Sequence, residues 1–170
     1  DRLVKLPWVR DAIVTRHWPD TIDIHITERQ PMALWQRKGR LYLVDNNGVA
    51  ITSKGLGRFR DLLIVVGNEA PKAAPTLLAM IPSEPALARQ VTAATLIGKR
   101  RWNLKLKGGI KVRLPEREPH KAWQRLARLN AKHKLLARDV RMIDMRLLNR
   151  LLIRPGVLGS QTIRVKGQRT

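Results

Sequence analysis

The chain has 170 residues and no cysteine, and it carries 34 Lys and Arg against 13 Asp and Glu, a net charge of +21. This length suits one domain, or a small domain beside a larger one, and the lack of thiols excludes disulfides, cysteine-ligated zinc and a cysteine nucleophile. The strongest apolar run, LLIVV at 62–66, is far below the ~18 residues of a membrane span, so we expect neither a span nor a signal peptide within these residues.

The first predicted elements are two strands, residues 9–18 and 21–27, joined by a Pro-Asp turn. In TIDIHIT (21–27), three isoleucines alternate with polar residues, which predicts a strand with its isoleucine face buried. Asp23 and His25 lie on the opposite face, where alternate side chains are about 6–7 Å apart, too far for direct hydrogen bonds. We interpret them as part of a solvated face rather than as a catalytic or metal site.

Two hairpins are predicted where a glycine-containing turn joins two apolar runs. Residues 40–52 turn at Asn47-Gly48, and residues 101–115 turn at Gly108-Gly109, with Trp102 at the start of a strand that alternates apolar and polar residues. Further strands are predicted at 61–67, at 91–97 and, as a pair with a tight turn at Asn149, within 140–156.

Helices are predicted at 70–80, at 83–90 with Ser83 as N-cap and Pro85 in the first turn, and at 118–139. The last of these is amphipathic. Its apolar stripe comprises Ala122, Leu126, Leu129, His133 and Leu136. A basic ridge lies beside the stripe and comprises Lys121, Arg125, Arg128 and Lys132. After Pro155 the chain is polar and contains glycine, so a mobile tail is expected.

The positive charge is concentrated in the second half of the chain. Residues 1–98 carry 13 Lys and Arg against 9 Asp and Glu, whereas residues 99–170 carry 21 against 4. Such a charge favours nucleic acid, anionic lipid or an acidic protein as partner. A nucleic-acid-binding protein that uses the basic ridge is therefore an alternative, although aromatic residues for base stacking are few and Trp102 and Trp123 are expected to be buried.

Signs of catalysis are absent from the sequence. It contains no phosphate-binding glycine loop, no nucleophile elbow and no zinc-protease motif. The four histidines are scattered, and the three serines stand in turn, cap or tail contexts. We expect a protein that is not an enzyme and that needs no cofactor or metal.

Five motifs, in order, resemble the FtsQ/DivIB family of bacterial cell-division proteins. Residues 6–35, LPWVRDAIVTRHWPDTIDIHITERQPMALW, are similar to the second half of the family's POTRA domain, and LVDNNGV (43–49) resembles the hairpin that opens its β domain. KRRWNLKLKGGIKVRLP (99–115), RLARL (125–129) and IDMRLLNRLLIR (143–154) resemble the later hairpin, helix and closing strands.

The resemblance implies an α+β fold, in which part of a POTRA domain precedes a larger β domain dominated by an antiparallel sheet with a long amphipathic helix. The expected division is residues 1–36, 37–154 and a flexible tail at 155–170. Family members are non-catalytic divisome scaffolds that link early and late division proteins and bind FtsB with FtsL, and the POTRA half is a candidate contact for other division proteins. One N-terminal span anchors them in the inner membrane, with these domains on the periplasmic side at the septum. That span would be missing from this sequence, and no specific nucleic acid is expected as partner.

In the family, FtsB adds a strand to the edge of the last strand of the β domain, a mode that uses the unpaired backbone groups of a sheet edge. The matching positions here are Asn149, Arg150, Leu151, Leu152, Ile153 and Arg154. Arg146 and Leu147 precede them, and Arg146 would pair either with an acidic partner residue or with Asp144 on the same strand face. Lys99 and Arg100, ahead of the hairpin tryptophan, are a second expected contact for carboxylates or plain surface charge.

Overall fold

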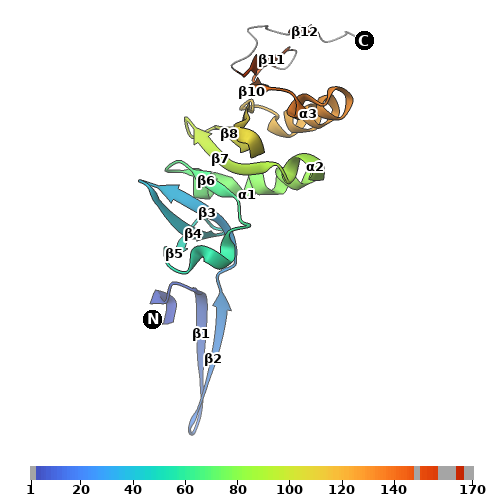
Figure 1. The fold of residues 1–170 in the computed structure, drawn as a ribbon. Coiled ribbons are helices and arrows are strands. Elements are labelled where there is room, and N and C mark those ends of the chain that lie inside the picture. The colour runs from blue at the N-terminus through green and yellow to red at the C-terminus, as the bar shows by residue number, and fades with distance from the viewer. Residues whose placement is uncertain (1–2, 148–149, 157–163, 167–170) are drawn as a thin grey trace.

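The computed structural model describes residues 3–147, 150–156 and 164–166. Its strands form a two-stranded hairpin and a ten-stranded sheet with the order β12-β11-β10-β9-β8-β7-β6-β3-β4-β5 (Figure 1). The α+β class predicted from the sequence is confirmed. The strands are β1 (Val9–His17), β2 (Thr21–Glu28), β3 (Pro31–Arg37), β4 (Arg40–Asp45), β5 (Ala50–Thr52), β6 (Ile64–Val66), β7 (Val91–Ile97), β8 (Arg101–Leu106), β9 (Lys111–Arg113), β10 (Val140–Asp144), β11 (Arg150–Pro155) and β12 (Arg164–Lys166).

The α helices are α1 (Ala70–Met80), α2 (Pro85–Ala88) and α3 (Pro119–His133). Short 3-10 helices are η1 (Leu3–Lys5), η2 (Leu56–Phe59), η3 (Ile81–Ser83), η4 (Lys107–Gly109) and η5 (Leu135–Ala137). No helix in the described part of the chain combines the length and the apolar character needed to cross a membrane.

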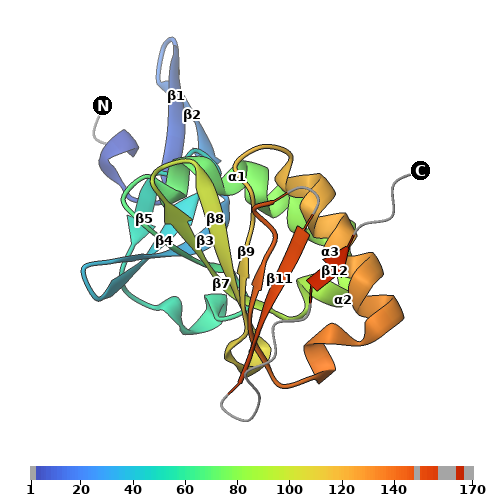
Figure 2. The same cartoon turned by 90° about the horizontal axis from the view of Figure 1, so that it is seen from above.

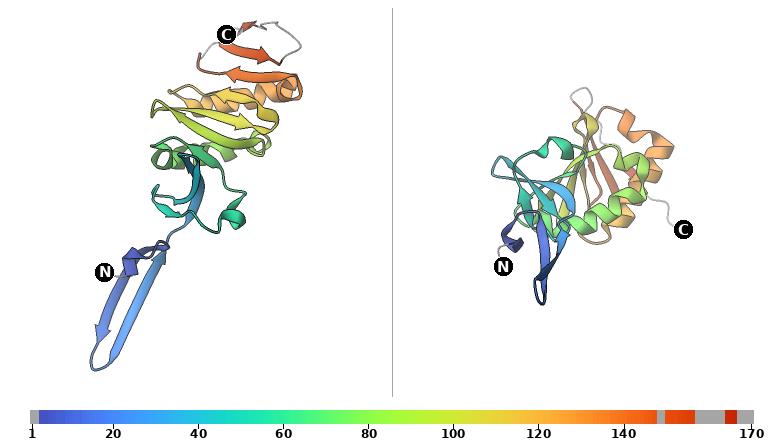
Figure 3. Two further views of the ribbon diagram at one scale, coloured as in Figure 1. Left: turned by 60° about the vertical axis from the view of Figure 1, so that its left-hand side comes forward. Right: turned by 90° about the horizontal axis from the view of Figure 1, so that it is seen from below.

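The β1–β2 hairpin projects from one end of the molecule, opposite to β11 and β12 (Figures 1 and 3). Ile22, Ile24 and Ile26 are 60%, 52% and 49% exposed, so the prediction of a buried isoleucine face is wrong for these residues. The alternation is present, but no described element packs against either face of β2, whose residues are all exposed. The polar face is solvated, and His17 Nε2 pairs with Asp23 Oδ2 at 3.0 Å between two half-exposed side chains.

Strand β3 belongs to the large sheet, because it pairs with β4 in antiparallel and with β6 in parallel orientation. The predicted boundary at residue 36 falls within this strand, which runs from Pro31 to Arg37. Proline can begin a strand at no cost to the ladder, which suits Pro31 as the first residue of β3.

The main core lies between the sheet and the three α helices, which lie along the same side of it (Figures 1 and 2). Strand β8 shows the predicted alternation, since Trp102, Leu104 and Leu106 are buried. Trp123 of α3 is fully buried, as predicted, and its Nε1 donates to the Ile81 carbonyl at 3.1 Å. That bond satisfies the indole N–H, which buried tryptophans require.

Three predicted details are wrong, two in helices and one in a strand. Helix α3 ends at His133 rather than at 139, because Lys134 adopts a left-handed conformation (φ 49°) and donates its N–H to the Asn130 carbonyl. The Asn130 side chain then accepts the N–H of Leu136 at 2.9 Å and starts η5. Glu84, not Ser83, stands at the N-cap of α2, and the Ser83 hydroxyl lies 3.2 Å from His120 Nε2 instead. Strand β6 has three residues, shorter than the predicted 61–67.

The chain beyond Pro155 contains one described strand. Residues 164–166 form β12, which pairs with β11 in antiparallel orientation. The sequence predicts a mobile tail from residue 155 onward. For Pro155, the last residue of β11, and for residues 164–166, the structure shows strand instead. Polar composition did not reveal this pairing, which depends on an open neighbouring edge rather than on local apolar pattern.

Candidate functional site

Strand β11 has one side turned into the core and one turned to solvent. Leu151 and Ile153 are 2% and 8% exposed, whereas Arg150, Leu152 and Arg154 point outward. Leu151 and Ile153, which the resemblance places in the interface, are thus available to a partner through their backbone groups rather than their side chains.

The two edges of β11 differ. Its inner edge pairs with β10 over most of its length, with Ile153 opposite Ile143 and Leu152 opposite Asp144. Its outer edge pairs with β12 only at Arg150, Leu151 and Leu152. Within the described ranges, no strand pairs with residues 153–155 on that outer edge. Asn149 lies outside the described residues.

Asp144, at the end of β10, holds Arg146 in a fixed position. The Nε of Arg146 lies 2.9 and 3.0 Å from the two carboxylate oxygens of Asp144, and its Nη2 lies 2.7 Å from Oδ2. The backbone N–H of Arg146 also donates to Oδ1 at 3.1 Å. The internal bridge that the sequence left open as an alternative is therefore present.

Asp144 and Arg146 each stabilise the charged form of the other, and this shifts both pKa values. Burial is the largest single effect on Asp144 and raises the pKa, but the hydrogen bonds and charge of Arg146, with the charge of Arg113, outweigh it and lower the pKa below its ordinary value. Arg113 Nη1 lies 3.7 Å from the same carboxylate. Conversely, the hydrogen bonds to Asp144 raise the pKa of Arg146, which stays protonated.

This geometry leaves Arg146 able to meet a second carboxylate. The guanidinium is a planar fork, so an acceptor that engages Nε and Nη2 leaves the Nη1 corner directed away from it. The Arg146 side chain is 39% exposed, and the neighbouring Leu147 is 53% exposed. A cation fixed by a buried carboxylate, followed by an exposed apolar side chain, thus lies where the chain leaves β10 toward β11.

Lys99 and Arg100 lie in the turn between β7 and β8, where Lys99 adopts a positive φ of 62°. Arg100 Nε is 3.3 Å from Glu116 Oε2, and both side chains are more than half exposed, so this bond is weak and exchangeable. Close pairing with Glu116 was not foreseen, because the two residues are distant in sequence and meet only once β8 and β9 pair.

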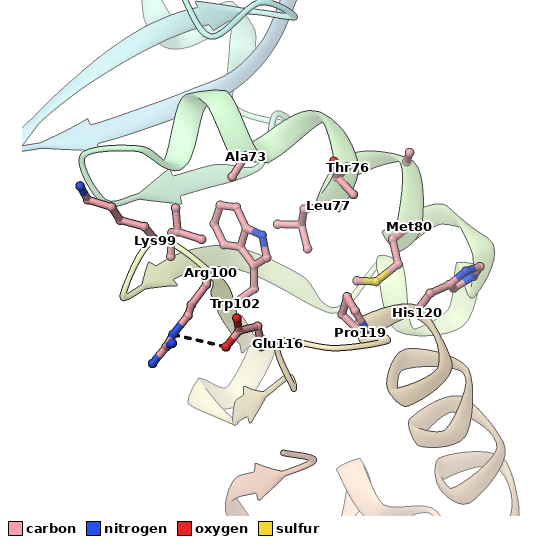
Figure 4. Close-up of a pocket in the computed structure, with 12 residues that line it drawn as sticks. Ala73, Thr76, Leu77, Met80, Lys99, Arg100, Trp102, Glu116, Pro119 and His120 are labelled. Atoms are coloured by element: carbon pink, nitrogen blue, oxygen red, sulfur yellow. Dashed lines mark ion pairs between the residues drawn. The ribbon is translucent and has the colours of Figure 1, made fainter. Parts of the chain in front are cut away.

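A groove of about 550 Å³ opens beside these two cations. Figure 4 shows it bordered by α1, by the turn that carries Lys99 and Arg100, and by the start of α3, with Trp102 and Leu77 along it. The predicted site residues therefore divide into two clusters at the same end of the strands. The backbone bonds Leu114 N to Trp102 O and Met145 N to Arg113 O connect β8, β9 and β10 at this end, two strand spacings or about 10 Å across.

The basic ridge on α3 is less distinctive. Lys121 contacts Glu118, while Arg128 and Lys132 are exposed on the helix surface. In the described part of the chain, no group of three or more His, Asp or Glu side chains is placed to hold a metal ion. The exposed positive charge is thus distributed over a solvated helix face.

Two protein-family models match successive parts of this chain. The model of the family described as "Cell division protein FtsQ/DivIB, C-terminal" matches residues 33–146. The chain belongs to the FtsQ/DivIB family. The model of the FtsQ-type POTRA domain matches residues 1–29, and the two matches meet near the junction that β3 marks. The family match includes Lys99, Arg100, Asp144 and Arg146, and it ends before β11.

Two relatives match a longer part of the chain. Cell division protein FtsQ of Bradyrhizobium diazoefficiens is 39% identical over 153 residues, covering 90% of this chain and 45% of the relative. FtsQ of Rickettsia conorii is 39% identical over 153 residues, covering 90% of this chain and 57% of the relative. The chain thus spans about half the length of these relatives. A solved structure of the major extracytoplasmic domain of DivIB from Geobacillus stearothermophilus, in its trans isomer, is 14% identical with a TM-score of 0.42, covering 64% of this chain and 96% of that one.

Proposed function

We propose that this chain is the periplasmic part of a non-catalytic divisome scaffold that binds FtsB, together with FtsL, and links early to late division proteins at the septum. An inner-membrane anchor of a single span belongs to the same proposal. The observation that carries it is the outer edge of β11, which is partnered only at residues 150–152 among the described residues. Backbone groups on such an edge are ready to pair with an extended peptide.

The side chains around the edge indicate an acidic partner. Arg150 and Arg154 point outward on β11, and Arg146 is held at the entrance to that strand by Asp144. Leu152 and Leu147 add exposed apolar contacts between these cations. Backbone pairing supplies affinity, and alternate side chains supply specificity, so a strand with acidic and apolar residues in alternation suits this edge.

The second cluster supports a longer contact. Lys99 and Arg100 lie at the same strand end as Arg146, beside an apolar groove. Because the Arg100–Glu116 pair is exposed and weak, a partner carboxylate can replace Glu116 at small cost. We propose that an acidic segment next to the added strand contacts this cluster.

A calorimetric titration of the chain with the periplasmic segment of FtsB, at low and high salt, tests the proposal. Saturable binding that persists at high salt is expected, since backbone pairing is insensitive to screening. A random DNA duplex serves as the comparison, because phosphate binding loses affinity with a log–log slope of about −0.9 per neutralised phosphate. If FtsB binding disappears at high salt and DNA binds equally well, the result would favour the alternative, a nucleic-acid-binding protein that uses the basic ridge.

A further inference from the structure

We infer that β12 is an internal competitor for the docking edge, and that an acidic extended segment binds by replacing it. The inference rests on the proposed function, because it concerns the same edge of β11. In the structure, the chain's own residues 164–166 lie where an added strand would begin, opposite Arg150, Leu151 and Leu152. Strand addition at this edge is therefore an exchange of one strand for another rather than occupation of an empty site.

The length of β12 makes the exchange feasible. The strand has three residues, whereas β11 has six, so a longer incoming strand can pair along residues 153–155 before β12 leaves. Pairing that starts at the unpartnered half of β11 needs no prior opening. A tethered strand nevertheless competes well, because a short connection gives it an effective concentration in the millimolar range.

The residue types of β12 that pair with β11 explain why an acidic segment would displace β12. Arg150 stands opposite Lys166, and Leu152 stands opposite Arg164. The internal strand thus has no acidic residue type at either register position. A segment with Asp or Glu opposite Arg150 would gain an attractive pair at the position where β12 offers another cation.

The experiment compares the full chain with a variant that ends at Gly156, using the FtsB periplasmic segment as probe. Removal of an internal competitor raises the apparent affinity by the inverse of the fraction that is open, and we expect a gain of about threefold or more. The truncation also removes Arg164, Lys166 and Arg169. If the tail acted only by its charge, truncation would weaken binding of an acidic segment, so the two explanations predict opposite signs.

Val165→Pro in the full chain provides a variant of unchanged charge, because proline disrupts a strand without altering the cations beside it. It should reproduce the gain in affinity. Hydrogen exchange without partner provides a second readout: those amides of residues 150–152 that face β12 should lose protection in both variants, whereas those that face β10 should keep it. Unchanged protection would show that β12 does not cover the edge, and unchanged or weaker binding would show that it does not compete; either result overturns the inference. If neither the full chain nor the variants bind FtsB, the proposed function fails and the exchange with it, while hydrogen exchange still reports on β12.

Discussion

Arg29 Nη1 lies 2.7 Å from Asp45 Oδ2, and this ion pair connects the base of the β1–β2 hairpin to the turn between β4 and β5. Asp45 is fully buried and also accepts the backbone N–H groups of Asn47 and Val49 at 2.9 and 2.8 Å. The backbone N–H of Arg29 donates to the Trp8 carbonyl at 2.8 Å. One carboxylate therefore holds the hairpin base and closes the turn that opens the β domain.

A smaller apolar cluster surrounds this junction. Leu34, Leu43 and Ile51 are buried on the sheet, and Trp8 and Phe59 pack against them. The Trp8 and Phe59 rings stack at 6.1 Å between centroids. The hairpin is therefore joined to the sheet at its base by both polar and apolar contacts, although its far end is surrounded by solvent.

Asp45→Asn should lower the free energy of unfolding by about 3 kcal/mol, since it leaves Arg29 without its charge partner in a largely buried site. Urea denaturation of the purified chain measures this change. Asp61→Asn is the matched control, because Asp61 is exposed and surface substitutions typically change stability by less than about 0.5 kcal/mol. Equal effects of the two substitutions would contradict the role assigned to Asp45.

Stability should fall on acidification below about pH 4. Burial is the largest effect on Asp45 and raises the pKa, but the bonds from Val49, Arg29 and Asn47 together lower the pKa below its ordinary value, as the bonds to Arg146 do for Asp144. A folded pKa below the unfolded value of about 3.9 gives stability that is fully present above that value and is lost as the pH falls through the folded pKa.

Asp144→Asn separates the contribution of Asp144 to the acid sensitivity from that of Asp45. The variant cannot lose the charge of Asp144 on acidification, so its unfolding free energy should decline less between pH 5 and the acid limit than that of the unchanged chain. Urea titrations at a series of pH values measure the slope. An identical slope in both proteins would show that Asp144 does not contribute to the acid sensitivity.

Arg146→Ala should weaken FtsB binding by about tenfold, less than the loss expected for a fully buried hydrogen-bonded charge pair, because the Arg146 side chain is partly exposed. Arg146→Lys should recover little of this loss, because a lysine cannot engage Asp144 through a planar fork and still direct a second corner at the partner. Calorimetry measures both affinities, and urea denaturation establishes that each variant remains folded. Full affinity of a folded Arg146→Ala variant would remove this residue from the interface.

Reversal of both charges in the β7–β8 turn, Lys99→Glu with Arg100→Glu, should slow FtsB association and reduce its dependence on salt, because exposed charges at the rim act mainly on the association rate. Lys54→Glu, an exposed cation near β5, is a control that reverses one charge away from this turn. Stopped-flow measurements at two ionic strengths give the rates. Equal slowing by a single control reversal would indicate a general effect of net charge rather than a contact at this turn.

The sequence predicted those elements whose signal is local. The glycine turns at Asn47-Gly48 and Gly108-Gly109 gave both hairpins, and the alternation in β8 gave its buried face. The isoleucines of β2 show the limit of such patterns: alternation reports which side chains could be buried together, not whether another layer covers them. Similarly, the end of α3 depends on the Asn130 side chain that bonds to Leu136, a competition that an apolar stripe does not record.

In the candidate site, too, local relationships could be predicted from the sequence and long-range contacts could not. Asp144 and Arg146 are two residues apart, at the end of β10 and just beyond it, so an extended backbone places them on the same face. The neighbour of Arg100, Glu116, depends on the pairing of β8 with β9 and is not visible locally. The occupant of the β11 edge was missed altogether, since three residues of a polar tail carry no strand signal until an open edge is beside them.

The central claim, strand addition at β11, is most directly tested by calorimetry with FtsB peptides methylated at backbone nitrogens. Alternate N–H groups of an added strand face the receiving edge, so methylation of every second residue in one phase should abolish binding, and methylation in the other phase should leave the affinity nearly unchanged. That alternation is the result the account predicts. Equal affinities of the two peptides, or equal losses, would contradict strand addition, because a helix or a charge contact has no reason to distinguish the phases.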